Sequence, residues 1–162
     1  SWKSPTGCAT GCGRGMPMTD APQARRATPA DIPACAAVIN GWIDRTDWFP
    51  RLHGPEIIEQ AFRDAWDARD IFVIGAPVAG YVSVDPDQRK IAALYTSRPG
   101  AGLGKALLDK AKEGREMLFL RTHLPNEAAQ RFYRREGFVQ VGGPIAPGPP
   151  ETVPEIRMEW RA

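Results

Sequence analysis

Hydrophobic residues recur every three to four positions in two early segments of the chain, residues 28–44 and 55–66. This spacing predicts two amphipathic helices, each with one apolar face. Thr28 is a suitable N-cap for the first helix, and Pro29 suits its first helical position. Cys35 falls on the apolar face of that helix, so we expect it to pack as a small hydrophobic residue.

The period of the pattern then shortens. Residues 71–75, 78–84 and 90–96 form three runs rich in β-branched and aromatic residues, separated by short turns that contain Gly, Pro and Asp. Runs of this composition predict strands. Because the connections between them are short, these strands are expected to pair with antiparallel neighbours.

The second half of the chain alternates between the two patterns. Helices are predicted over residues 103–114 and 126–137, and strands over 117–122, 138–142 and 155–160. The whole order is ααβββαβαββ, which predicts a mixed sheet with helices packed on it. No repeat or second-domain boundary is visible, so residues 18–162 are expected to form a single domain.

Two features near the C-terminus complete the pattern. Seven of the nine residues in 142–150 are Gly or Pro, so this span is predicted to be a loop. Ile156, Met158 and Trp160 alternate along the last strand, where they would pack one face and could form a dimer edge. A homodimer is therefore possible.

Composition excludes several classes of function. The net charge of +2 is too small for a nucleic-acid footprint, and no apolar run approaches the roughly 18 residues of a membrane span. Cys8 and Cys12 lack the neighbouring ligands of a zinc site, and nothing demands disulfides, so no metal and a cytoplasmic location are expected. Residues 1–17 are rich in Gly and Pro, without the apolar core of a signal peptide. We interpret them as an added leader, with Met18 as the natural start.

The most informative stretch is residues 95–113, YTSRPGAGLGKALLDKAKE, in which a strand enters a glycine-rich loop and a helix leaves it. Such loops hold phosphate groups at helix N-termini. A P-loop is excluded because Pro99 stands at its first glycine and Ala106 replaces its Ser or Thr. A dinucleotide fingerprint is excluded because Lys105 or Leu107 would occupy its third glycine.

A third family fits better. The stretch resembles the cofactor motif Q/R-x-x-G-x-G/A of the acetyl-CoA-dependent GNAT N-acetyltransferases, and NEAAQRFYRREGF (126–138) resembles their second motif, N-x-x-A-x-x-F-Y-x-x-x-G-F. The resemblance covers residues 24–161, with one departure, because Pro99 stands where the family has Gln or Arg. It implies an α/β (α+β) fold with a twisted, mostly antiparallel mixed sheet of six to seven strands and about four helices.

The resemblance also implies an activity and a set of site residues. Acetyl-CoA would donate its acetyl group to an amine by direct attack, with Tyr133 protonating the departing thiolate. The alternative is a sensor that binds acyl-CoA without turnover. The residues expected to bind CoA are Leu94, Tyr95, Thr96, Gly100, Ala101, Gly102, Leu103, Gly104, Lys105, Asn126 and Tyr133.

The acceptor side is less defined by sequence. Residues 42–53 carry a W-x-x-x-T-D-W-x-P-R-x-H run that is similar to a bacterial branch of the superfamily, and the run names no substrate. The expected acceptor contacts are Trp48, Arg51, His53 and His123. Core packing is the simpler interpretation for Trp48, whereas a surface ion pair is an equally simple one for Arg51. The general base remains open among His53, His123, Tyr95 and Asp85.

Overall fold

The computed structural model describes residues 22–162, so the expected leader and its two cysteines lie outside the described residues. Four α-helices lie in this part of the chain: α2 (Ile32–Asp44), α3 (Pro55–Ala65), α4 (Leu103–Lys112) and α5 (Glu127–Arg135). Two short 3-10 helices, η1 (Pro29–Asp31) and η2 (Trp66–Ala68), flank the first pair. The strands are β1 (Arg25–Arg26), β2 (Asp70–Ile74), β3 (Gly80–Asp85), β4 (Lys90–Thr96), β5 (Met117–His123), β6 (Val139–Ile145) and β7 (Glu155–Arg161).

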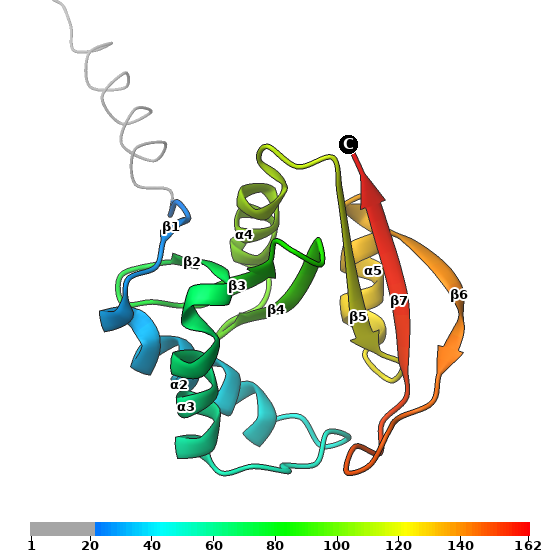
Figure 1. Ribbon diagram of the computed structural model, residues 1–162, viewed down its shortest axis with the longest axis horizontal. Helices are drawn as coiled ribbons and strands as arrows, with labels where there is room; N and C mark the ends of the chain where they lie inside the picture. Colours follow the sequence, from blue (N-terminus) through cyan, green and yellow to red (C-terminus); the bar gives the residue numbers. More distant parts are fainter. Residues whose placement is uncertain (1–21) are drawn as a thin grey trace, which may run out of the picture.

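The seven strands form one open sheet in the order β1-β2-β3-β4-β5-β7-β6 (Figure 1). Every neighbouring pair is antiparallel except β4 and β5, which are parallel. The predicted fold class is therefore confirmed. Sequence analysis missed only the two-residue strand β1, which pairs with β2 at the edge of the sheet.

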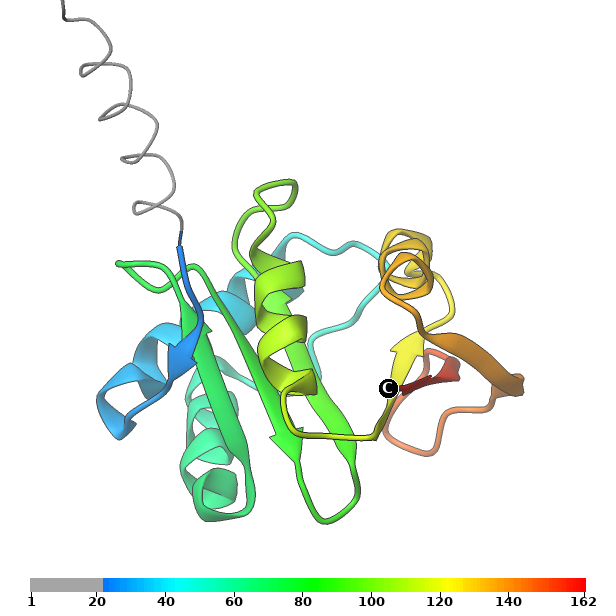
Figure 2. The ribbon, with the colours of Figure 1, turned by 90° about the horizontal axis from the view of Figure 1, so that it is seen from above.

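Two hydrophobic clusters hold the helices on opposite faces of this sheet. On one face, α4 and α5 pack through Leu107 and Tyr133 against Val82 and other strand residues. On the other face, α2 and α3 cover Tyr81, with Cys35 of α2 fully packed in that cluster, as the helical pattern predicts. Strand β3 is buried along its whole length because helices cover both of its faces (Figure 2).

Two predictions near the C-terminus are wrong. Strand β6 continues through Ile145 into the span predicted to be a loop. It tolerates Pro144 because it is the edge strand and its register with β7 shifts between Val141 and Ile145. Strand β7 pairs with β5 on one side and with β6 on the other, so it has no free edge for a dimer.

The N-terminal cap of the first helical segment makes a testable contribution to stability. The Asp31 carboxylate accepts hydrogen bonds from Arg25 Nη1 and Nη2 (2.9 Å each) and from the backbone N–H of Thr28 (2.8 Å). The hydrogen bonds from Arg25 have the largest effect on the pKa of Asp31. Together with the hydrogen bond from Thr28, they lower it from 3.8 to about 2. Because the folded state favours the ionised carboxylate, its stabilisation is present above the unfolded pKa and is lost as the pH falls through about 2.

We expect Asp31→Asn to lower the free energy of unfolding by about 1 kcal/mol at pH 7, the usual value of a capping interaction. The difference between the variant and the wild type should shrink between pH 4 and pH 2. Urea unfolding followed by circular dichroism at several pH values measures it. A difference that stays constant over that range would contradict the role of the ionised carboxylate.

Candidate active site

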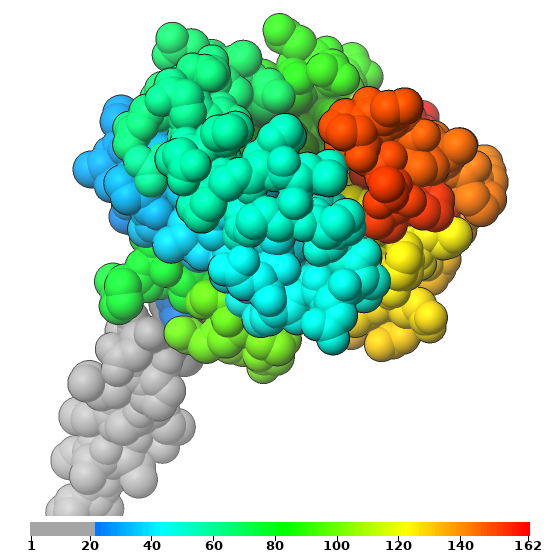
Figure 3. All heavy atoms as spheres, turned by 90° about the horizontal axis from the view of Figure 1, so that it is seen from below, coloured from blue at the N-terminus to red at the C-terminus, as the bar shows by residue number. Residues whose placement is uncertain are grey.

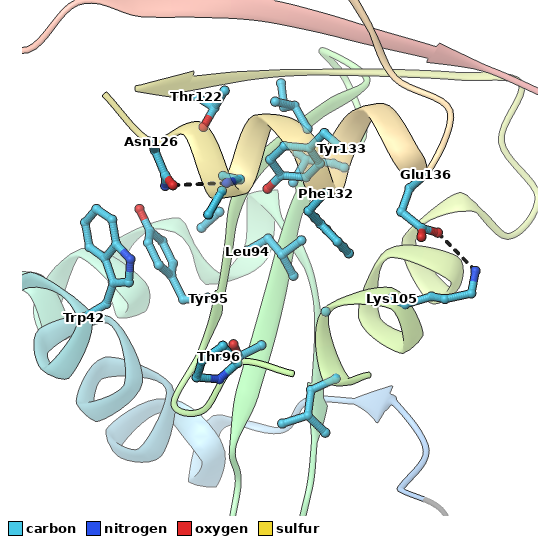
Figure 4. Close-up of a pocket in the computed structure, with 18 of the residues that line it drawn as sticks. Trp42, Leu94, Tyr95, Thr96, Lys105, Thr122, Asn126, Phe132, Tyr133 and Glu136 are labelled. Atoms are coloured by element: carbon cyan, nitrogen blue, oxygen red, sulfur yellow. Dashed lines mark hydrogen bonds and ion pairs between the residues drawn. The ribbon is translucent and has the colours of Figure 1, made fainter. Parts of the chain in front are cut away.

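The centre of the sheet is split. Strands β4 and β5 are paired only at Lys90↔Phe119 and Ile91↔Leu120, at the start of β4. Beyond these two pairs the strands separate, and a cavity of about 740 Å³ opens between them (Figure 4). This volume lies within the usual range of ligand sites, about 300–1,000 Å³. The cavity therefore separates two strands that are neighbours in the sheet.

The separation leaves backbone groups of β4 directed at the cavity. Tyr95 is opposite Tyr81 on β3, and the Ser97 N–H donates to the Ala79 carbonyl (2.8 Å). Because hydrogen-bonded positions alternate along an antiparallel pair, the backbone groups of Leu94 and Thr96 point away from β3. Those two residues therefore present N–H and C=O groups to the cavity, as the edge of an open sheet would.

One of these groups already has a partner. Arg45 Nη2, at the end of α2, donates to the Thr96 carbonyl at 3.0 Å. Arg45 also lines the cavity. The contact ties the end of β4 to α2 and leaves the backbone groups of Leu94 for an extended ligand that adds to the strand edge.

The glycine loop forms one end of the cavity. Gly100 and Gly102 have φ angles of +79° and +75°, and Gly102 is the N-cap of α4. A Cβ at either position would meet no atom within 4 Å, so the positive φ angle, not crowding, requires glycine here. The N–H groups of the first turn of α4 have no partner within the helix and carry partial positive charge. The loop is therefore suited to bind an anion.

The residues on either side of Gly102 contribute charged side chains near this end of the cavity. Lys105 Nζ lies 3.0 Å from Glu136 Oε1, and this ion pair joins the start of α4 to the end of α5. Arg98 and Pro99 both line the cavity, so a cationic side chain lies next to the proline that replaces the Gln or Arg of the motif. Ala101 is the one residue of the expected CoA set that does not line the cavity.

Helix α5 contributes the two polar side chains of the second motif. Asn126 caps the helix, with Oδ1 accepting from the Ala129 N–H at 3.1 Å, and its side chain faces the cavity (Figure 4). Tyr133 lies two turns later, packed against Phe132 and Phe138, and its hydroxyl points into the same cavity. Burial raises the pKa of Tyr133, so its hydroxyl keeps its proton at neutral pH.

An aromatic cluster closes the opposite end. Trp42 of α2 packs against Tyr95 of β4 (ring centroids 5.1 Å apart) and stacks on His123 of β5 (6.3 Å). Phe49 and Trp48 lie 4.9 Å and 5.5 Å from the His123 ring. In Figure 3 the α2–α3 connection, in cyan, adjoins the yellow β5–α5 region and the orange-red segment before β7. The cluster therefore bridges the two separated halves of the sheet.

The structure brings together only part of the expected acceptor side. His123 lines the cavity, and Trp48 packs behind it against Trp42. Arg51 donates to Asp44 Oδ1 (2.8 Å), Asn40 Oδ1 (2.9 Å) and the His53 carbonyl (2.9 Å), which holds the α2–α3 connection in place. Neither Arg51 nor His53 lines the cavity.

Of the four possible bases, Asp85 is engaged elsewhere. Its carboxylate accepts from the backbone N–H groups of Asp87 and Gln88 and pairs with Arg69 at 3.3 Å, so it stabilises the β3–β4 turn. Several cavity residues were not predicted from the sequence because no fixed motif position marks them. They are Arg45, Thr122 and Glu136.

Comparison with known proteins identifies the architecture. Residues 67–140, which include the glycine loop, β5 and α5, match the acetyltransferase (GNAT) domain family. Residues 67–140 therefore carry a GNAT acetyltransferase domain. The match covers β4, α4, β5 and α5, which build most of the cavity. A search among curated proteins found no significant match.

Solved GNAT structures share the fold. A GCN5-related N-acetyltransferase from Rhodopseudomonas palustris is 19% identical, with a TM-score of 0.68 over 88% of this chain and 97% of that one. The protein yncA from Salmonella typhimurium, solved with its cofactor acetyl-CoA, is 20% identical, with a TM-score of 0.65 over 88% and 94%. A ribosomal-protein-alanine N-acetyltransferase from Brucella melitensis is 22% identical, with a TM-score of 0.65 over 86% and 99%.

Within residues 22–162, every helix is too short or too polar to span a lipid bilayer. In the same part of the chain, no three His, Cys, Asp or Glu side chains are grouped so that they could hold a metal ion.

Proposed function

We propose that this protein transfers an acetyl group from acetyl-CoA directly to a primary amine. The observation that carries the proposal is the single cavity that joins three features: the glycine loop, the open edge of β4 and the Asn126–Tyr133 face of α5. The first suits a pyrophosphate, the second suits an extended amide chain, and the third offers a proton donor where the strands part. A CoA thioester contains a group for each of them.

The binding half of the reaction follows from these features. The pyrophosphate binds to the first-turn amides of α4 at Gly102, with Arg98 alongside. The pantetheine amides pair with the backbone groups of Leu94 in the manner of an added strand. The Oδ1 atom of Asn126 caps α5, so its side-chain NH₂ is the group that donates to the ligand.

The chemical half needs an acid and a free amine. Tyr133 donates its proton to the departing thiolate. A lysine-like amine, with a pKa of about 10.4, is only about one part in 2,500 neutral at pH 7, so a base is needed on the acceptor side. Direct attack is supported by Cys35, the free cysteine of the described residues, because burial raises its pKa to about 12 and prevents it from acting as a thiolate nucleophile.

Release of the CoA thiol tests this function. The assay uses acetyl-CoA with phenethylamine, spermidine, lysine and a peptide with a free α-amino group, and thermal unfolding is measured with and without acetyl-CoA. We expect thermal stabilisation by acetyl-CoA and amine-dependent thiol release with at least one acceptor. Stabilisation without release on any acceptor would favour the acyl-CoA sensor, and the absence of both would refute the proposal.

Replacing Tyr133 by phenylalanine tests the acid. The packing of the ring against Phe132 and Phe138 is kept, so only the hydroxyl is lost. We expect kcat to fall about 100-fold, the lower end of general acid catalysis, because a thiolate is a good leaving group. The KM for acetyl-CoA should change less than about twofold. An unchanged kcat would show that water protonates the thiolate.

A further inference from the structure

His123 lies on the face of the sheet opposite Tyr133. Along β5, Leu118 and Leu120 are buried in the cluster that contains Tyr133, whereas the His123 ring packs against Trp42 on the side covered by α2. Because side chains of a strand alternate between faces, Thr122 and His123 point to opposite sides. The gap between β4 and β5 joins these sides, so Tyr133 and His123 line one cavity from opposite faces.

The surroundings of His123 combine aromatic rings with a carboxylate. Trp42, Trp48 and Phe49 remove water from the imidazole, and this burial lowers its pKa below the usual 6.5. His123 is opposite Glu155 on β7, and Nε2 lies 3.7 Å from Glu155 Oε2. A ring in this setting is mostly neutral at pH 7, with a carboxylate beside it that favours a proton once one arrives.

The other charged and titratable groups near the ring come from four parts of the chain. On β5, Arg121 Nε binds the second oxygen of Glu155 at 3.0 Å. Glu151, before β7, acts with Glu155 against the effect of burial on the pKa of His123. Arg45, at the start of the α2–α3 connection, and Tyr95 of β4 line the same cavity. Burial raises the pKa of Tyr95 to about 12, so its hydroxyl stays neutral. His123 is thus the imidazole among these groups, and burial favours its neutral form.

We propose that His123 is the general base that takes the proton from the acceptor amine, with Glu155 as its positioning residue. The inference rests on the proposed acetyl transfer. The Glu155 carboxylate, 3.7 Å from Nε2, stabilises the imidazolium that forms when the ring takes a proton. The proton that His123 removes comes from the ammonium form of the acceptor, and His123 releases it to solvent. The lone pair of the resulting neutral amine forms a bond to the thioester carbonyl carbon, and the C–S bond breaks. The thiolate takes the proton of Tyr133, and the remaining excess N–H proton of the new amide returns through solvent to Tyr133.

Two nucleophiles of different basicity distinguish a His123 that acts as the general base from a His123 that only packs in the cavity wall. His123→Gln is assayed with acetyl-CoA, using hydroxylamine and whichever of the four amines above the wild type acetylates fastest. We expect about a 100-fold loss of kcat/KM with that amine and less than about a fivefold loss with hydroxylamine, which is already largely neutral at pH 7. Equal losses with both nucleophiles would overturn the role of His123 as base while leaving the proposed function intact.

A titration independent of turnover tests the electrostatic setting. The chain has two histidines, so His53→Gln leaves one imidazole to follow by NMR. We expect His123 to titrate below 6.5 and Glu155→Gln to lower its pKa further, whereas the matched change Glu113→Gln, at an exposed site, leaves it in place. A pKa that does not respond to Glu155→Gln would overturn the positioning role. Failure of the wild type to acetylate any amine would instead overturn the proposed function, and the base role with it.

Discussion

Gly102→Asp is expected to weaken acetyl-CoA binding by at least about 100-fold. Gly102 caps α4 with a φ angle of +75°, and the space around its missing side chain is open. A carboxylate there would stand beside the pyrophosphate in the proposed complex. Two like charges about 4 Å apart near a protein surface repel by roughly 4 kcal/mol, and the N-terminal amides of α4 would also be neutralised in part.

Gly102→Asn is the matched control for this prediction. Asparagine has nearly the same shape as aspartate and, like it, tolerates a positive φ angle better than most residues. Both variants therefore carry the same backbone strain and differ mainly in charge. Isothermal titration calorimetry should show that Gly102→Asn keeps most of the affinity. Equal affinities for the two variants would mean that the glycine loop does not bind the pyrophosphate.

Leu107→Ala is expected to lower the free energy of unfolding by about 2–5 kcal/mol. Leu107 is 0% exposed and lies on the face of α4 that packs on the sheet. Its Cδ1 lies 3.2 Å from the position that a Cβ of Gly80 would occupy, so the leucine fills the space that the glycine leaves. Truncation removes buried apolar surface and leaves a cavity. Such a loss is a large fraction of the total stability of a small domain, about 5–15 kcal/mol.

Leu52→Ala is the control for this second prediction, because it removes the same atoms from a side chain that is 40% exposed. It should change the stability by less than about 0.5 kcal/mol. Urea unfolding of the two variants and the wild type gives the comparison. Equal effects at the two sites would contradict the packing of α4 beneath the glycine loop.

The elements of this protein could be predicted where local chemistry determines them. The amphipathic periods of α4 and α5, the capping Asn126 and the positive φ angles of the glycine loop all depend on neighbouring residues. The two motifs lie on consecutive helices, so their order along the chain already indicated that they belong together. Strand β6 was misjudged because composition alone does not show which strand lies at the edge of a sheet.

The details of the cavity depend on contacts between distant residues, which a single sequence does not reveal. The family resemblance placed Leu94, Tyr95 and Thr96 at the cofactor, but nothing in residues 90–96 shows that β4 separates from β5 directly after Ile91, because strand pairing is decided by the packing of the whole sheet. Arg45 contacts Thr96, 51 residues later, without any motif that links them. Arg51 was a reasonable acceptor contact by residue type, but its partners Asp44 and Asn40 show that it stabilises the α2–α3 connection instead.

The central claim is that the acetyl group moves from CoA to an amine nitrogen. The most direct test is mass spectrometry of the four-amine mixture after incubation with the protein and acetyl-CoA labelled with ¹³C in the acetyl group. We predict that the label appears on an amine in amounts equal to the free CoA produced, and that this transfer falls about 100-fold with Tyr133→Phe. Free CoA with unlabelled amines, or no free CoA at all, would contradict the account.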